Sequence, residues 1–490
     1  MMKRLLCSII MTVLTAGSVM PVPADAADPD TRMQDDAWIR YVEQSAELEK
    51  VPGLTVAAVK GAETGYKSWG YTDLKKQTPM TEDTPVHIGS CSKAFTALAV
   101  LLLQEEGKLS AEDSVSDHLP WWRVTYQGKD ADIKIRQLLN HSSGLPYITT
   151  GYPKDADAET IARLAKDTEL ASEPGTQFRY IDFGYCVLSL LVETVSGMRY
   201  DEYVVKEIMQ PIGMTHSGFD LPVIQGHTYF GGRLRAHDDI QPKGNEGAAL
   251  VCTTPSDMVL WMKAQLSQLE LPEKLANAIA ASHESDPALQ PEGTPDRDYC
   301  SGWHQSSDGI LWHGGQNPNF TARVIIDPVH DTAVFTVCNA AADTSYYAAR
   351  SCYMNLLGFP ADSFPDIARG MMCRYDLYAS VISAVISVFL LIAVIMLWTQ
   401  KKRLAKKSST PKREKAVLIS RMMLLLPLLC FSAAFPRILG AAKGYPGFGY
   451  TGFRVWGLYS EIAACLLSDG LIVCLITASV MRYIRQRNAA

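Results

Sequence analysis

A serine and a lysine three residues apart, Ser90 and Lys93, have the types and the spacing for covalent catalysis. The pattern predicts a helix over 90–107, on which residues three apart share one face, so the hydroxyl and the amine would lie together. The N-terminus of that helix adds backbone N–H groups and a positive dipole end, which suit a developing oxyanion. A lysine removed from water there can lose its proton near neutral pH and act as a base. These two residues therefore predict acyl transfer through a serine nucleophile.

The spacing alone is a weak signal, because it recurs at Ser409 and Lys412 in a basic segment. A serine that caps a helix, followed by a solvated lysine, is the simpler alternative. Three further motifs favour catalysis, namely 136–146 (RQLLNHSSGLP), 178–185 (FRYIDFGY) and 313–315 (HGG). With these motifs in this order, the chain resembles the serine β-lactamase and penicillin-binding-protein superfamily, on its class C and esterase side. The resemblance covers roughly 27–350.

The resemblance implies a role for each motif. Ser90 would be the acylated nucleophile and Lys93 its activating partner. Tyr180 would stand in the superfamily's Tyr-x-Asn element and carry the proton to the leaving amine. The segment 313–315 would replace the superfamily's Lys-Thr-Gly on the strand beside the pocket. The oxyanion hole would consist of the backbone N–H groups of Ser90 and Gln316.

A narrower resemblance rests on the long strand motif 313–320 (HGGQNPNF), on residues 126–129 and on three apolar segments near the C-terminus. Together these are similar to the membrane-bound, prodrug-activating D-asparagine peptidases, such as the colibactin-maturing peptidase. Members of that group remove an N-acyl-D-asparagine cap from an inactive precursor during export. The implied partners are an acylated peptide or polyketide-peptide precursor and membrane lipid, with an exporter or a second copy of the chain as further candidates.

The candidate substrate-binding residues are His313, Gly315, Gln316, Asn317, Asp182 and His87. Among them, Asn317 would contact the D-asparagine unit. Asp182 stands where the superfamily usually has an amide, and a carboxylate near Lys93 would favour the ammonium and oppose a base role. His87 stands where the colibactin enzyme has an acidic residue. His141 is expected to shape a turn rather than to take part in the chemistry.

The elements that must position these residues indicate one α/β domain over 27–370, an antiparallel sheet flanked by helices together with a helical region. Apolar periodicity predicts a helix over 33–48 and a hairpin of strands over 53–59 and 66–71. Three consecutive strands are expected near the other end, over 311–313, 321–326 and 332–337. We expect the two ends of the domain to close a single sheet, with the helical region inserted between them.

Both ends of the chain indicate export to a membrane. Residues 1–26 have the basic start, short apolar stretch and small-residue cleavage site of a signal peptide. Residues 371–490 are predicted to cross the membrane three times. The expected spans are about 377–398, 416–436 and 455–481. The basic linker 401–415 indicates a cytoplasmic loop. The predicted location is therefore the inner or plasma membrane, with the catalytic domain extracytoplasmic and the C-terminus cytoplasmic.

The composition excludes several other classes of function. The formal net charge of −6 leaves no basic footprint for nucleic acid. The 11 cysteines lack the paired spacing of a zinc site or a disulfide framework, so no metal and no cofactor is expected. Two alternatives stay open. One is a D,D-peptidase, β-lactamase or esterase, and the other is a β-lactam sensor that is acylated without turning over.

Overall fold

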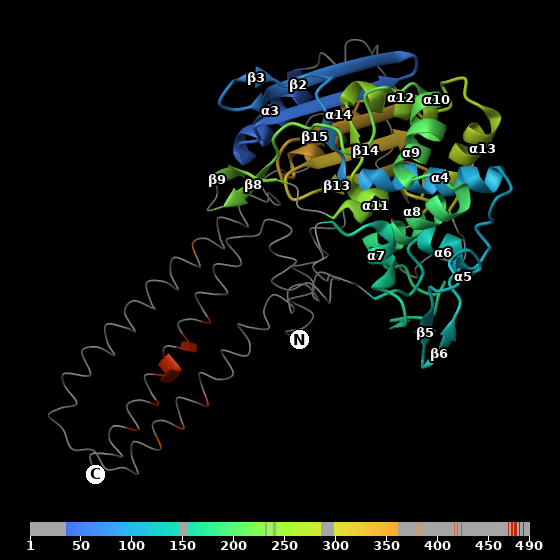
Figure 1. The fold of residues 1–490 in the computed structure, drawn as a ribbon. Coiled ribbons are helices and arrows are strands. Elements are labelled where there is room, and N and C mark those ends of the chain that lie inside the picture. Colours follow the sequence, from blue (N-terminus) through green and yellow to red (C-terminus); the bar gives the residue numbers. More distant parts are fainter. Residues whose placement is uncertain are drawn as a thin grey trace. The chain divides into compact units, whose positions relative to one another are not determined.

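An antiparallel sheet of eight strands forms the centre of the part of the chain that the structure describes (Figure 1). This computed structural model describes residues 36–146, 155–230, 233–238, 242–285 and 298–360, with isolated positions after 380. The strand order is β11-β12-β13-β14-β15-β1-β2-β3. The strands are β1 (Gly53–Lys60), β2 (Glu63–Asp73), β3 (Thr78–Pro79), β11 (Asp298–Tyr299), β12 (His304–Gln305), β13 (Leu311–Gln316), β14 (Thr321–Asp327) and β15 (Thr332–Cys338).

Strands from the two ends of the domain lie side by side in this sheet. β1 pairs with β15 in antiparallel register, from Leu54 opposite Cys338 to Lys60 opposite Thr332. Both strands are almost wholly buried, as their continuous apolar runs require. The prediction that the two ends of the domain close one sheet is therefore confirmed.

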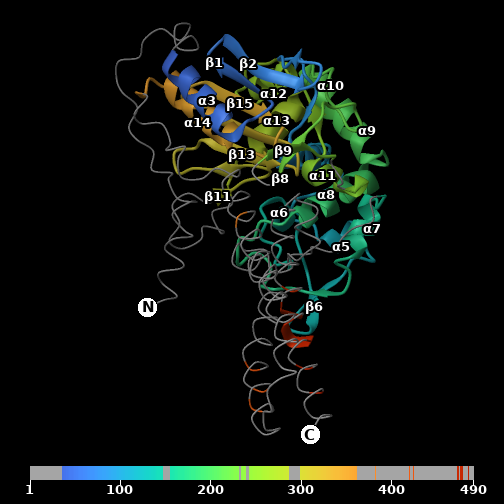
Figure 2. The same ribbon diagram turned by 90° about the vertical axis from the view of Figure 1, so that its left-hand side faces the viewer.

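Helices pack against the sheet in two groups (Figures 1 and 2). α14 contacts α3, β14 and β15, whereas α12 contacts β1, β15 and α13. The helices are α3 (Asp36–Glu49), α4 (Lys93–Glu105), α5 (Val115–His118), α6 (Ile135–Leu139), α7 (Ala158–Arg163), α8 (Asp182–Ser196), α9 (Tyr200–Val204), α10 (Gln210–Ile212), α11 (Glu246–Ala249), α12 (Pro255–Gln265), α13 (Glu273–Ser282) and α14 (Thr344–Leu356). The shorter helical turns are η1 (Gly89–Ser92), η2 (Val205–Met209) and η3 (Lys243–Asn245). Small additional pairings join β4 (Val86–His87) to β10 (Cys252–Thr253), β5 (Val124–Tyr126) to β6 (Lys129–Ala131) and β7 (Thr168–Glu169), and β8 (His227–Phe230) to β9 (Arg233–Ala236).

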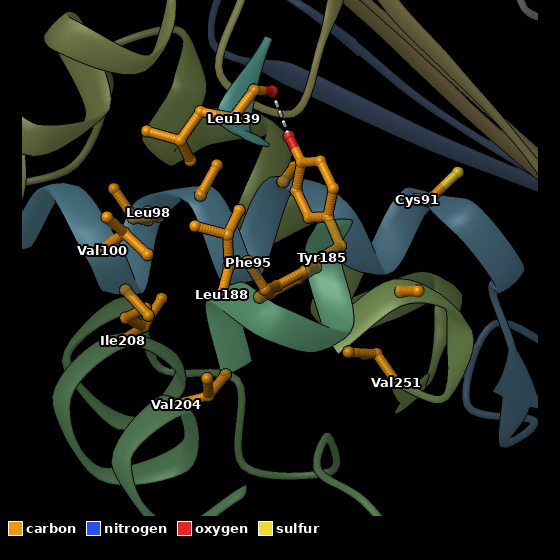
Figure 3. Close-up of a cluster of buried hydrophobic side chains, with 14 of the residues drawn as sticks. Cys91, Phe95, Leu98, Val100, Leu139, Tyr185, Leu188, Val204, Ile208 and Val251 are labelled. Atoms are coloured by element: carbon orange, nitrogen blue, oxygen red, sulfur yellow. Dashed lines mark hydrogen bonds between the residues drawn. The ribbon is translucent and has the colours of Figure 1, made fainter. Parts of the chain in front are cut away.

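α4 is the central helix of the hydrophobic core. Every residue from Lys93 to Leu103 is buried, and a helix that is mostly apolar all round belongs in the interior. α8 packs against it, and Figure 3 shows Phe95 of α4 close to Leu188 of α8. α4 begins at Lys93 and α8 at Asp182, so the packing of the core sets the first residues of these two helices close together.

The helix expected over 90–107 begins three residues later than predicted. Gly89–Ser92 forms a separate 3₁₀ turn, and the α-helix starts at Lys93. The chain enters this turn through Gly89, whose φ of +53° is a left-handed conformation that glycine adopts without strain. Ser90 is therefore held on a tight turn ahead of α4.

The predicted signal peptide 1–26 and the linker 401–415 lie outside the described residues, and only isolated positions of the three predicted spans are described. Among the helices that the structure does describe, none has the length and apolar character needed to cross a bilayer.

Candidate active site

Two glycines bring the turn that carries Ser90 against strand β13. A Cβ atom added to Gly315 would lie 1.8 Å from the carbonyl oxygen of Ile88. A Cβ atom added to Gly89 would lie 2.5 Å from the backbone nitrogen of Gln316. The two backbones therefore touch directly, which no larger residue allows. This contact sets the amide of Gln316 beside the turn of Ser90, the pair predicted to form the oxyanion hole.

This close contact makes a testable prediction for Gly315. Gly315→Ala should lower the free energy of unfolding by about 3 kcal/mol, because the added methyl group overlaps backbone atoms that cannot move aside cheaply. Chemical denaturation of the purified variant measures this loss. Gly184→Ala, within α8, is the matched control, because its added Cβ would lie an ordinary 3.5 Å from Leu138. This substitution should raise the free energy of unfolding by up to about 1 kcal/mol. Equal stability of both variants would contradict the packing.

Lys93 is fully buried and binds three acceptors. Its Nζ donates to Ser90 Oγ at 3.0 Å, to Asp182 Oδ1 at 2.6 Å and to the carbonyl oxygen of Ala248 at 2.9 Å. An ammonium group has three N–H donors, so these contacts use all of them. In this arrangement the amine of Lys93 orients the Ser90 hydroxyl, and its three contacts match the donors of an ammonium group.

Tyr180 lies beside this pair, and His141 holds its backbone. The Lys93 Nζ lies 5.0 Å from the centroid of the Tyr180 ring. His141 Nδ1 accepts the backbone N–H of Ile181 at 3.2 Å, and its carbonyl oxygen accepts the N–H of Arg179 at 2.7 Å. Burial holds the pKa of His141 well below its usual value, so its imidazole is neutral at pH 7. These contacts fit the structural role expected for His141.

His313 is buried on β13 with both ring nitrogens occupied. Nε2 lies 3.0 Å from the hydroxyl of Tyr299, and Nδ1 lies 2.8 Å from the carbonyl oxygen of Gly314. Burial, followed by the nearby His304 and Lys93, holds the pKa of His313 well below its usual value. A neutral imidazole cannot supply the positive charge of the lysine that it replaces. No motif in the sequence marks Tyr299, which only the fold brings to this histidine.

The other candidate substrate-binding residues surround the turn and β13. His87 is half-buried on β4, with its ring 5.8 Å from that of Phe320. Gln316 ends β13 with an exposed side chain. Asn317 is fully buried and donates to the carbonyl oxygen of Ala249 at 3.4 Å, next to the residue that binds Lys93. Asn317 thus supports the backbone around Lys93, and its contact with a D-asparagine unit stays a prediction.

Cys91, the neighbour of Ser90, is unsuited to be the nucleophile. Its side chain is buried, with Sγ 3.6 Å from the carbonyl oxygen of His313. Burial raises the pKa of the Cys91 thiol to about 12, so the reactive thiolate does not form at neutral pH. The hydroxyl of Ser90 therefore remains the candidate nucleophile on this turn.

Comparison with curated proteins shows two kinds of relative. The chain is 29% identical over 325 residues to Protein flp of Staphylococcus aureus strain COL, covering 63% of this chain and 63% of that protein. It is 26% identical over 378 residues to the unguisins hydrolase ungD' of Aspergillus campestris, covering 70% of this chain and 67% of that protein. The chain thus spans less than two thirds of the length of Protein flp.

Solved structures share the fold. An octameric penicillin-binding protein homologue from Pyrococcus abyssi superposes with a TM-score of 0.61 at 25% identity, covering 68% of this chain and 80% of that one. A class C beta-lactamase superposes with a TM-score of 0.59 at 20% identity, covering 67% of this chain and 98% of that one. The Beta-lactamase family itself matches residues 38–357. The superfamily predicted from the motifs is therefore confirmed, and the chain belongs to the beta-lactamase family.

Proposed function

We propose that this chain is a serine hydrolase that removes an N-acyl-D-amino acid cap, N-acyl-D-asparagine in particular, from a secreted natural-product precursor. The observation that carries acyl transfer at Ser90 is the hydrogen bond of 3.0 Å between Lys93 Nζ and Ser90 Oγ, on a turn packed against β13, and the D-asparagine cap comes from the resemblance of the sequence motifs. Membership of the beta-lactamase family supports acyl transfer at this serine. One relative is, by its name, a hydrolase of unguisins.

The geometry suggests how the proton moves during acylation. Because Lys93 already donates to three acceptors, Tyr180 takes the proton of Ser90 as Oγ attacks the scissile carbonyl. The amine of Lys93 lies 5.0 Å from the centroid of the Tyr180 ring, so a cationic side chain adjoins the residue proposed to take the proton. The N–H groups of Ser90 and Gln316 receive the oxyanion. Tyr180 then returns the proton to the leaving amine, and water releases the acyl group by the reverse sequence.

The location and partners complete the proposal. The sequence of residues 1–26 and 371–490 supports an exported domain on a membrane anchor, with the C-terminus in the cytoplasm. Such an anchor would keep the site where an acylated precursor emerges, with membrane lipid or an exporter beside it. A D,D-peptidase, β-lactamase or esterase, or a sensor without turnover, is the competing function.

Hydrolysis of three substrates by the purified full-length chain tests the proposal. We expect kcat/KM for an acyl-D-Asn amide to exceed that for an acyl-D-Ala-D-Ala peptide and for a chromogenic cephalosporin by at least about 100-fold, as sites that hydrogen-bond a substrate group discriminate strongly. Preference for the D-Ala peptide or the cephalosporin would contradict it. Stoichiometric labelling of Ser90 without steady-state product would instead support the sensor.

A further inference from the structure

Asp182 has one oxygen bound to Lys93 and one oxygen that reaches none of the protein groups the structure describes. Oδ1 lies 2.6 Å from Lys93 Nζ. Within the described ranges, no hydrogen bond or ion pair reaches Oδ2. The side chain of Asp182 is 38% exposed, whereas that of Lys93 is 0% exposed. The second oxygen therefore remains available to a group that arrives from solvent beside Ser90.

The charges around Ser90 balance one another. The ammonium of Lys93 is cancelled by the carboxylate of Asp182, and His313 adds no charge because it is neutral. An anionic group that approached Asp182 would be repelled by its free carboxylate oxygen, and the ammonium of Lys93 is already paired with Asp182. A carboxylate oxygen accepts hydrogen bonds and cannot donate them. The group that fits beside Oδ2 is therefore a hydrogen-bond donor, such as an N–H.

We propose that Oδ2 of Asp182 accepts an N–H from the substrate, and that the site selects a carboxamide or amine and rejects a carboxylate at this place. The inference rests on acylation of Ser90, the proposed function. It names a substrate class for that reaction: acyl donors with an N–H group near the scissile carbonyl. The carboxamide of asparagine belongs to this class, and the isosteric carboxylate of aspartate does not.

Arg323 on β14, opposite Gly314, is a second cation of this sheet, and it supplies the alternative to be tested, a preference for an anionic substrate. Its guanidinium carbon lies 3.9 Å from the ring centroid of Trp312 and 5.2 Å from that of Tyr346. It faces Gly314 of β13, where an added Cβ atom would lie 3.2 Å from NH1. Burial lowers the pKa of Arg323 to about 10, so it is charged at pH 7. Arg323 and Asp182 thus predict opposite preferences for the charge of the substrate.

Two matched boronic acids distinguish these preferences without requiring turnover. Each carries boron in place of the scissile carbonyl, one with the side chain of D-Asn and one with that of D-Asp. Ser90 Oγ adds to the trigonal boron while its proton passes to Tyr180, as in the proposed acylation, and a tetrahedral boronate results. The inhibition constant Ki of each compound is measured on the full chain at pH 7 by competition, as the compound prevents a fluorescent penicillin or fluorophosphonate from labelling Ser90.

The wild-type chain should bind the carboxamide compound about 100-fold more tightly than the carboxylate compound, because like charges in contact oppose binding. In Asp182→Asn this ratio should fall below about 5-fold, since an amide can donate to a carboxylate. Arg323→Met is the control and should leave the wild-type ratio in place. Circular dichroism verifies that each variant is folded.

Three results separate the inference from the proposed function. A wild-type ratio near one, with both compounds bound to Ser90, would overturn the role of Asp182 and leave the hydrolase intact. Tighter binding of the carboxylate compound that is lost in Arg323→Met would assign the selection to Arg323. Failure of both compounds and of the label to reach Ser90 would remove the proposed function and this inference with it.

Discussion

Ser90→Ala is expected to abolish formation of the acyl-enzyme and to reduce turnover by at least about 10⁴-fold, as removal of a serine nucleophile does in other hydrolases. The substitution removes the oxygen that Lys93 orients at 3.0 Å. The neighbouring thiol of Cys91 cannot replace it, because burial raises the pKa of Cys91 to about 12. The loss should therefore be nearly complete.

The fold should survive this change. The Ser90 hydroxyl makes one hydrogen bond with the protein in the described ranges, which contributes about 1 kcal/mol. Mass spectrometry of the protein mixed with an acyl-D-Asn amide measures the adduct. Ser92→Ala, on the same turn, is the matched control. The Ser92 hydroxyl accepts the backbone N–H of Val251 at 3.1 Å and has no role in the proposed reaction. An adduct on Ser90→Ala, or none on Ser92→Ala despite normal folding, would contradict the assignment.

Lys93→Met is expected to reduce kcat/KM by at least about 10³-fold while the protein remains stable. Methionine matches the length of lysine but cannot orient Ser90 or place a positive charge 5.0 Å from the Tyr180 ring. The Asp182 side chain is 38% exposed, so water can solvate the carboxylate that loses its partner and the protein should remain folded. Steady-state kinetics and a melting curve on the same sample separate these two effects.

The Asp182→Asn variant shows which role Lys93 plays. If Lys93 acts as an ammonium donor, loss of the carboxylate should reduce kcat/KM by about 10- to 100-fold. The double variant Lys93→Met/Asp182→Asn should then be no slower than Lys93→Met alone, because the effects of two residues in contact are not additive. If Lys93 instead acts as the base, Asp182→Asn should be faster than wild type, since the free amine would form more easily. A faster Asp182→Asn variant would therefore assign the proton transfer to Lys93 rather than to Tyr180.

The sequence alone was enough to predict the local parts of this site and of the fold. The spacing of Ser90 and Lys93 spans a single helical turn, so their contact depends on local geometry. The continuous apolar runs of β1 and β15 predicted buried strands, and the turn residues between the last strands predicted their order. The family motifs predict Tyr180 and 313–315 in one site, and the rings of Tyr180 and His313 lie 6.0 Å apart.

Only the tertiary structure decided which partners those residues have. Lys93 binds Asp182, 89 residues away, and Ala248, 155 residues away, and no spacing in the sequence indicates either partner. His313 is neutral because it is buried against Tyr299, which no spacing in the sequence indicates. Spacing predicts contacts within one turn of helix or one hairpin, whereas burial and charge state depend on how distant segments pack. The chemistry available at Ser90 is therefore set by that packing.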